Sequence, residues 1–289
     1  MKKITVNSQR LIGLISFLLI MLAFSMAKAQ VKTIWETDSL FFAPECVVYD
    51  SVNKCIYVSN YNDKGGFRKK EDMLYDECIS KIDMNGKLQE MKWIDNLMGP
   101  TGLAIYNQKL FIVERDGLSI VDIAQRKVQG KIIIEGAKFL NDIAIDKDGR
   151  AYISDTDNNC IYKIEQGKSS IWFSGDILDR PNGLYIDNDK LLVGLSGKAN
   201  LLSLSLSDKK IEAIATGVSD YIDGINKLNN QYLLSWKSEL YIVGDNNAKS
   251  VLFESEKDFL ADFDFIKKDK LVIIPALLTN KVIALKLED

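Results

Sequence analysis

The sequence predicts an all-β protein, a six-bladed β-propeller whose ring is closed by a strand from the N-terminal side. Three observations predict it: a unit of four short strands fills about forty residues, this unit recurs six times, and the last copy lacks one strand. Propeller blades are four-stranded sheets arranged radially, with repeats of this length. The composition is globular, with 47% apolar residues, 27% charged residues and 4 prolines, so neither disorder nor a coiled coil is indicated.

The unit is clearest at residues 141–164, NDIAIDKDGRAYISDTDNNCIYKI. β-Branched and aromatic residues form three strand-like runs, and the segments between them, 146–149 and 155–159, are rich in turn-forming Asp, Asn and Gly. A fourth run, SSIWFS, follows at residues 169–174. The predicted blade is therefore an inner strand, a tight turn, a second strand, a polar loop and two outer strands.

Equivalent units open at six positions: Pro44, Pro100, Asn141, Pro181, Asp223 and Asp262. Successive openings lie 56, 41, 40, 42 and 39 residues apart. After the last opening the chain has room for only three strands, whereas residues 31–37 (VKTIWET) form a strand-like run that belongs to no unit. Placing this run as the outer strand of the last blade closes the ring and removes an exposed edge.

The first unit is longer because residues 60–77 are inserted between its second and third strands. The loop after the second strand of a blade lies on the rim where the first strand begins, so the insertion is either a lid over the mouth of the ring or a surface loop.

Residues 1–29 have the pattern of a secretory signal peptide. Basic residues precede a 14-residue apolar run, 11–24, and Ala27-Lys28-Ala29 fits a cleavage signal. Because the run is shorter than a bilayer span, we expect a removed signal, a single propeller domain over residues 30–289 and an exported protein, periplasmic or secreted, without a membrane span. The alternative is a retained N-terminal anchor.

Removing the signal, with its four basic residues, changes the charge balance from 37 basic against 40 acidic residues to 33 against 40. This negative balance argues against nucleic acid as a partner and suits cations or neutral small molecules; we expect a monomer. The four cysteines show no C-x-x-C spacing, so buried thiols are expected in preference to a thiolate metal site.

The residues that begin the inner strands predict a site on the central axis. Aligned on the apolar pair that follows, they are Glu45, Thr101, Asn141, Asn182, Asp223 and Ala261. Carboxylates and amides gathered there would be costly if buried without partners, and a hard divalent cation would satisfy them. Ca²⁺ is the first choice because all these ligands are oxygens and the chain has no histidine, with Mg²⁺, Mn²⁺ or Zn²⁺ as alternatives. The competing interpretation is that Asn182-Gly183 and Asp223-Gly224 are ordinary turns.

Four motifs carry a resemblance to a known family: Ala43-Pro44-Glu45-Cys46 with the VVYDSVNKCIYVSN that follows, Phe139-Leu140-Asn141-Asp142, Pro181-Asn182-Gly183-Leu184 and Ile222-Asp223-Gly224. Their order and spacing resemble those of the gluconolactonase and regucalcin (senescence marker protein type) six-bladed propellers, and residues 154–164 resemble an NHL-type repeat.

The resemblance implies that Glu45, Asn182 and Asp223 are metal ligands and that Asn141 contacts the substrate. Thr101 shares the phase of these residues and joins the predicted substrate contacts. Lactonases of this family usually carry an arginine two positions before the asparagine, where this chain has Phe139. Arg180 is a candidate substitute, the alternative being a solvated rim charge.

The sequence therefore predicts a metal-dependent hydrolase of a small lactone or ester. A metal-activated water at the central axis would attack the acyl carbonyl, and Asp223 would take its proton. The absence of histidine excludes Ser-His-Asp hydrolysis and a histidine-based lyase of the streptogramin-cleaving type. Phe139 favours a substrate more apolar than gluconolactone. The alternative is a non-catalytic exported propeller with a structural metal and a rim that binds a ligand or a protein.

Overall fold

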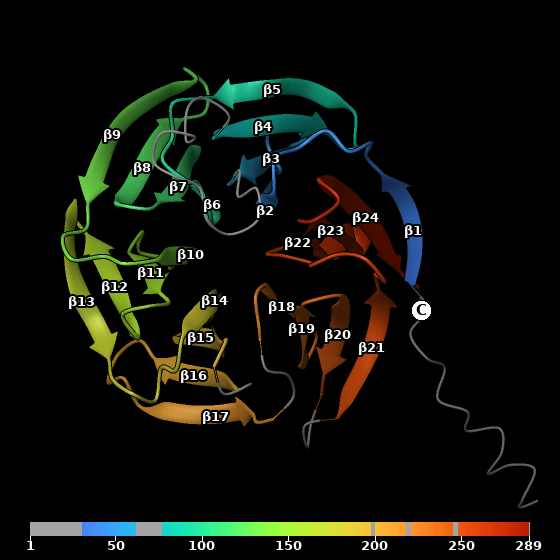
Figure 1. Ribbon diagram of the computed structural model, residues 1–289. Helices are drawn as coiled ribbons and strands as arrows, with labels where there is room; N and C mark the ends of the chain where they lie inside the picture. Colours follow the sequence, from blue (N-terminus) through green and yellow to red (C-terminus); the bar gives the residue numbers. More distant parts are fainter. Residues whose placement is uncertain (1–30, 62–76, 198–199, 218–220, 245–247, 289) are drawn as a thin grey trace, which may run out of the picture.

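The computed structural model describes residues 31–61, 77–197, 200–217, 221–244 and 248–288, which form six four-stranded sheets arranged in a ring (Figure 1). The predicted six-bladed propeller is confirmed. The predicted signal at 1–29 lies outside the described residues, as do residues 62–76 of the predicted insertion. No helix within the described ranges has the length and apolarity needed to cross a membrane.

Each blade runs from an inner strand at the axis to an outer strand at the rim (Figure 1). Blades 1 to 3 consist of β2 (Pro44–Asp50), β3 (Cys55–Asn60), β4 (Cys78–Asp83) and β5 (Leu88–Ile94); β6 (Leu103–Tyr106), β7 (Lys109–Glu114), β8 (Gly117–Asp122) and β9 (Lys127–Ile133); and β10 (Leu140–Ile145), β11 (Ala151–Asp155), β12 (Cys160–Glu165) and β13 (Lys168–Ser174). Blades 4 to 6 consist of β14 (Pro181–Asp187), β15 (Lys190–Leu195), β16 (Leu201–Ser205) and β17 (Ile211–Ala215); β18 (Ile225–Leu228), β19 (Gln231–Trp236), β20 (Glu239–Val243) and β21 (Lys249–Glu254); and β22 (Asp264–Ile266), η3 (Lys267–Asp269), β23 (Leu271–Ala276), β24 (Lys281–Leu287) and β1 (Val31–Glu36).

The ring closes through β1, which pairs antiparallel with β24 from Val31 opposite Leu287 to Glu36 opposite Ile283. Beyond the strand, the Thr37 backbone N–H donates to the Val282 carbonyl at 3.0 Å. The N-terminal segment therefore completes the last blade, as the missing fourth strand predicted.

The core lies between blades. Each of the six apolar clusters in the described chain is shared by two neighbouring blades, so every interface of the ring is a sheet-on-sheet contact. Second strands such as β3 and β11 are buried along their whole length because both of their faces meet a neighbouring blade. Each fully buried large apolar side chain in such an interface stabilises the ring by about 2 kcal/mol. The four cysteines are buried free thiols that pack in or beside these interfaces.

Candidate functional site

The inner strands surround the axis of the ring (Figure 1), and three predicted site residues lie at the start of these strands. Two others, Thr101 and Asp223, lie two residues before β6 and β18. Glu45, Asn141 and Asn182 are the second residues of β2, β10 and β14. In all three strands the antiparallel register slips at this position, between the first and the fourth residue. Such a bulge breaks the alternation of side chains and re-aims the residues within it. These inner strands therefore carry polar residues within the bulge at their start and regularly paired, mainly apolar residues after it.

Two glycines allow the inner strands to approach closely at this end. A Cβ placed on Gly183 would lie 1.6 Å from the carbonyl oxygen of Asp223, and one on Gly102 would lie 2.7 Å from the Cα of Asp142. Any side chain at these positions would push neighbouring blades apart. The glycine that follows Asn182 thus brings the backbone of blade 4 against that of blade 5 and sets Asn182 beside Asp223.

Four carboxylates gather at this end of the axis: Glu45, Asp142, Asp223 and Asp262. Asp142 and Asp223 are only 3% and 8% exposed. Burial, assisted by the charge of Asp142, raises the pKa of Asp223 to about 8. Burial likewise raises the pKa of Asp142 to about 7, although the backbone N–H groups of Leu184 and Ile143 oppose the shift. Burial disfavours the ionised form of these acids, and a cation beside them would supply the positive charge that favours it.

The other two acids follow the same logic. The pKa of Glu45 is raised well above its ordinary value by burial first, then by the charges of Asp223 and Asp142. That of Asp262 is also raised well above its ordinary value, by burial first and then by the charge of Asp142. The Cys46 thiol donates a hydrogen bond to Asp262 Oδ2 at 2.9 Å, which partly compensates. The charges of these carboxylates raise one another's pKa, as expected for acids that lie close together.

The predicted metal ligands include buried polar atoms that make no hydrogen bond within the described residues. These atoms are both the Oδ1 and the Nδ2 of Asn182, together with Oδ1 of Asp223. Leaving such groups unsatisfied costs about 1–3 kcal/mol each, so their retention calls for a ligand. No three His, Cys, Asp or Glu side chains within the described ranges form a metal site by themselves. The predicted set has a different composition, two carboxylates and one amide, and its oxygens fit the donor preference of a hard cation.

The remaining predicted residues are placed as follows. Thr101 is buried and its hydroxyl donates to the Leu140 carbonyl at 3.3 Å, so it joins blades 2 and 3. Asn141 is buried, and its backbone carbonyl accepts from the Gly102 N–H at 2.8 Å. Arg180 lies just before β14 with a side chain 52% exposed, paired with Asp157 at 2.8 Å. The guanidinium is thus engaged on the rim, whereas the other two residues lie in the wall of the axis.

The structure adds acidic residues that the sequence alignment passed over. Asp142 and Asp262 stand one residue after Asn141 and Ala261, the positions that were aligned. Comparing the next position as well would have found them, because the equivalents in blades 2, 4 and 5 are all glycine. Tyr221 was also missed. Its pKa is raised by burial first, then by the charges of Asp223 and Glu45, which places its phenol near these acids.

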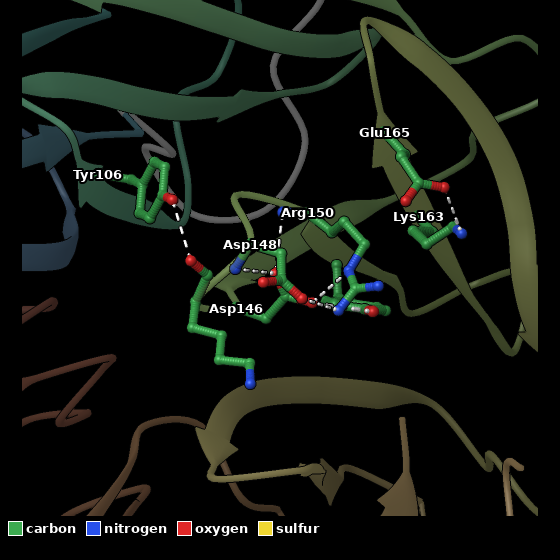
Figure 2. Close-up of polar contacts among 8 residues, drawn as sticks. Tyr106, Asp146, Asp148, Arg150, Lys163 and Glu165 are labelled. Atoms are coloured by element: carbon green, nitrogen blue, oxygen red, sulfur yellow. Dashed lines mark hydrogen bonds and ion pairs between the residues drawn. The ribbon is translucent and has the colours of Figure 1, made fainter. Parts of the chain in front are cut away.

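A second polar cluster lies at the other ends of the inner strands, around the tight turn between β10 and β11 (Figure 2). Asp146 Oδ1 accepts from the backbone N–H groups of Asp148 and Arg150, each at 3.0 Å. Its Oδ2 accepts from Arg150 Nε at 2.6 Å and from the Tyr152 hydroxyl at 3.3 Å. A cavity of about 530 Å³ opens beside this turn toward blade 4. Because both Asp146 oxygens are satisfied, we assign this cluster a structural role.

No protein-family model matches the chain, and no curated protein matches it. Solved structures do match it. A gluconolactonase from Xanthomonas campestris superposes with a TM-score of 0.71 at 14% identity, covering 93% of each chain. A virginiamycin B lyase from Staphylococcus aureus, a histidine-to-alanine variant described as catalytically inactive, has a TM-score of 0.62 at 12% identity, covering 90% of this chain and 99% of the other. The extracellular domain of a Bacteroides thetaiotaomicron hybrid two-component system has a TM-score of 0.55 at 14% identity over 84% of this chain and 33% of the other.

These likenesses confirm the expected relation to gluconolactonase-type propellers at the level of the fold. At such identities a shared fold carries a gluconolactonase, a lyase and an extracellular domain of a two-component system alike, so activity has to be argued from the site.

Proposed function

We propose that the chain is a hydrolase of small lactones or esters that works with a divalent cation at the mouth of the ring. The observation that carries the proposal is the pairing of unsatisfied buried oxygens on Asn182 and Asp223 with a surrounding group of carboxylates that repel one another. Such a group is stable only as protonated acids or around a positive charge.

Glu45, Asn182 and Asp223 would hold the cation, with Ca²⁺ first and Mg²⁺, Mn²⁺ or Zn²⁺ as alternatives. When bound, a divalent cation supplies positive charge that stabilises an acyl oxygen as it becomes anionic. Asp223 would accept the proton of the attacking water, which requires its ionised form; its pKa of about 8 falls when positive charge lies beside it.

Asn141, Thr101 and Arg180 are the proposed substrate contacts. Thr101 already uses its hydroxyl proton on the Leu140 carbonyl, so this hydroxyl is left to accept a hydrogen bond. Arg180 is the most exposed of the three, and it would have to break its ion pair with Asp157 to reach a substrate. A histidine-dependent lyase reaction is disfavoured because the chain contains no histidine.

The experiment is a measurement of metal content after purification, followed by assays on a panel of lactones and aryl esters with and without chelator. Wild type should contain a divalent metal and hydrolyse a member of the panel, and Asp223→Ala should lose both metal and activity while remaining folded. Asp187→Asn is the matched control, because this acid lies at the far end of β14 and pairs with Lys227. A folded wild type that is metal-free and inactive on the whole panel would sink the proposal.

The second candidate function is a non-catalytic exported propeller in which the metal is structural. The likeness to an extracellular domain of a two-component system favours keeping it. Bound metal with no hydrolysis of any substrate, and unchanged metal affinity when small lactones are added, would support this candidate. Export itself is proposed from the signal pattern at residues 1–29, and detection of the mature N-terminus after expression with that segment would test it.

A further inference from the structure

Three residues from three blades meet at the mouth of the ring. Tyr61 directly follows β3 in blade 1, Arg115 lies between β7 and β8 in blade 2, and Phe139 directly precedes β10 in blade 3. The rings of Tyr61 and Phe139 meet edge to face, with centroids 6.4 Å apart and an interplanar angle of 82°. The guanidinium carbon of Arg115 lies 5.4 Å from the centroid of the Tyr61 ring. We call Tyr61 and Phe139 the aromatic bridge.

The bridge joins blades that are not neighbours in the ring. Blade 1 packs on blade 2, and blade 2 packs on blade 3. The contact between Tyr61 and Phe139 therefore crosses blade 2 at the end where Arg115 lies between β7 and β8. Because Tyr61 follows a second strand and Phe139 precedes an inner strand, the contact lies at the end of the ring where the inner strands begin.

Hydrogen bonds from the backbone N–H groups position the backbone of both aromatic residues next to predicted site residues. The Tyr61 N–H donates to the Ala43 carbonyl at 3.2 Å, two residues before Glu45. Phe139 lies two residues before Asn141, and its backbone N–H donates to the side-chain carboxylate of Asp155 at 3.0 Å. The bridge is consequently tied to the same strand ends as the site.

Charges around the bridge are already compensated. Arg115 pairs with Glu77 at 3.6 Å, and the other oxygen of Glu77 accepts from the Gly99 N–H at 3.0 Å. Arg115 also lies against the Tyr61 ring, which favours a cation over the ring face. The nearby Glu114 is buried, accepts from Met98 N–H at 2.6 Å and pairs with Lys131 at 3.0 Å. Because these charged groups are paired with each other, we expect a ligand on this side of the ring to contact mainly the aromatic rings of Tyr61 and Phe139.

We propose that the aromatic bridge is the specificity-determining wall of the site and selects lactones or esters with an alkyl or aryl side chain over polyhydroxylated ones. This inference rests on the proposed function, whose cation would hold the acyl group while the side chain packs against Tyr61 and Phe139. Each buried methylene contributes about a fourfold gain in binding. A hydroxyl group packed there would lose its hydrogen bonds to water and find aromatic edges in their place.

The test compares two γ-lactones of the same ring, one with a pentyl side chain and one with a polyhydroxylated side chain of the same length. We expect wild type to prefer the pentyl lactone by about 50-fold or more in kcat/KM, since several methylenes contribute. Phe139→Ala should lower kcat/KM for the pentyl lactone about tenfold, mainly through KM, and change the hydroxylated lactone by less than about twofold. Tyr61→Ala should act alike, whereas Tyr61→Phe should keep the preference for the pentyl lactone because it keeps the ring.

Two controls make the outcomes separable. Phe173→Leu changes an aromatic residue on the outer strand β13 and should leave the preference unchanged. Calorimetric binding of the pentyl lactam, which the enzyme would not readily open, reports on the wall without catalysis; Phe139→Ala should weaken this binding about tenfold.

If wild type hydrolyses both lactones equally, or if Phe139→Ala affects both alike, the wall is overturned while the proposed function stands. If wild type hydrolyses neither, the proposed function fails and the lactam decides: binding weakened by Phe139→Ala supports the wall, and absent or unchanged binding overturns it.

Discussion

Asp223 at the axis and Asp146 in the turn between β10 and β11 are both buried acids, 8% and 2% exposed, yet their surroundings differ. Asp146 accepts four hydrogen bonds, two of them from Arg150 (Figure 2). Asp223 has an oxygen that makes no hydrogen bond within the described residues, and its neighbours are other acids. The comparison separates a carboxylate that stabilises the fold from one that the fold holds ready for a ligand.

Other turn acids resemble Asp146. Asp50 accepts from the backbone N–H groups of Val52 and Asn53 and from the Asn53 amide. Asp155 accepts from the N–H groups of Lys138 and Phe139. Burial of a carboxylate is thus common in this ring, and Asp223 differs because its oxygen without a hydrogen bond lies among other buried acids.

The largest difference between the two acids should appear in stability. Asp146→Ala leaves Arg150 without its buried partner and two backbone N–H groups without an acceptor, so we expect a loss of about 3 kcal/mol in the free energy of unfolding. Asp223→Ala in metal-free protein removes a buried acid whose ionised form is disfavoured by burial and by the charge of Asp142, and stability should stay equal or rise. Urea unfolding of both variants in chelator measures this. Equal destabilisation by the two changes would contradict the distinction.

The second difference concerns stabilisation by a cation. Ca²⁺ at 100 times its dissociation constant should stabilise wild type by about 2.7 kcal/mol, because it binds the folded state only. Asp146→Ala should keep this increment, on top of its lower baseline, and Asp223→Ala should lose it. Thermal unfolding in a calcium titration, repeated with Mg²⁺, measures the increments and orders the metals. An identical calcium response in Asp223→Ala would remove Asp223 from the ligand set.

The third difference is a pH dependence of the metal-free protein. The folded-state pKa values of Asp223 and Asp142, about 8 and about 7, lie above their ordinary value of 3.8. The folded state therefore binds protons more tightly than the unfolded state, so this contribution to stability is complete below pH 4 and is lost as the pH rises toward 8. We expect the Tm in chelator to rise when the pH is lowered from 8 to 5.

Asp223→Asn should reduce this slope, and saturating Ca²⁺ should flatten it by stabilising the ionised acids. Asp187→Asn, outside the cluster, is expected to leave the slope as in wild type. A Tm in chelator that falls steadily from pH 8 to pH 5 would mean that the axis acids are ionised in the folded protein.

The sequence was sufficient for the architecture because each blade is specified locally, by apolar runs and turn residues that recur with a fixed period. It was also sufficient to place Glu45, Asn182 and Asp223 at equivalent positions, because the repeat shows which residues of different blades correspond as well as how long each blade is. The bulges at these positions are not visible in a single sequence, and they let consecutive residues such as Asn141 and Asp142 both serve the axis region. The Tyr61–Phe139 contact was out of reach for another reason: it joins non-neighbouring blades, and no periodic pattern encodes such a pairing.

The smallest expected effect concerns Thr101, which has features of both kinds of buried polar residue. Its hydroxyl is satisfied by the Leu140 carbonyl, like a structural group, yet Thr101 lies two residues before the inner strand β6, close to where the site residues of other blades lie on their inner strands. Thr101→Val keeps the shape and removes the hydrogen bond, so a loss of about 1 kcal/mol in unfolding free energy is expected from the structural role alone. Thr101→Ser keeps the hydroxyl and should restore most of that loss.

If Thr101 also contacts substrate, Thr101→Val will raise KM for a lactone while kcat changes little, and Thr101→Ser will return KM to the wild-type value. An unchanged KM in Thr101→Val, with the expected loss of stability, would assign Thr101 to the fold alone.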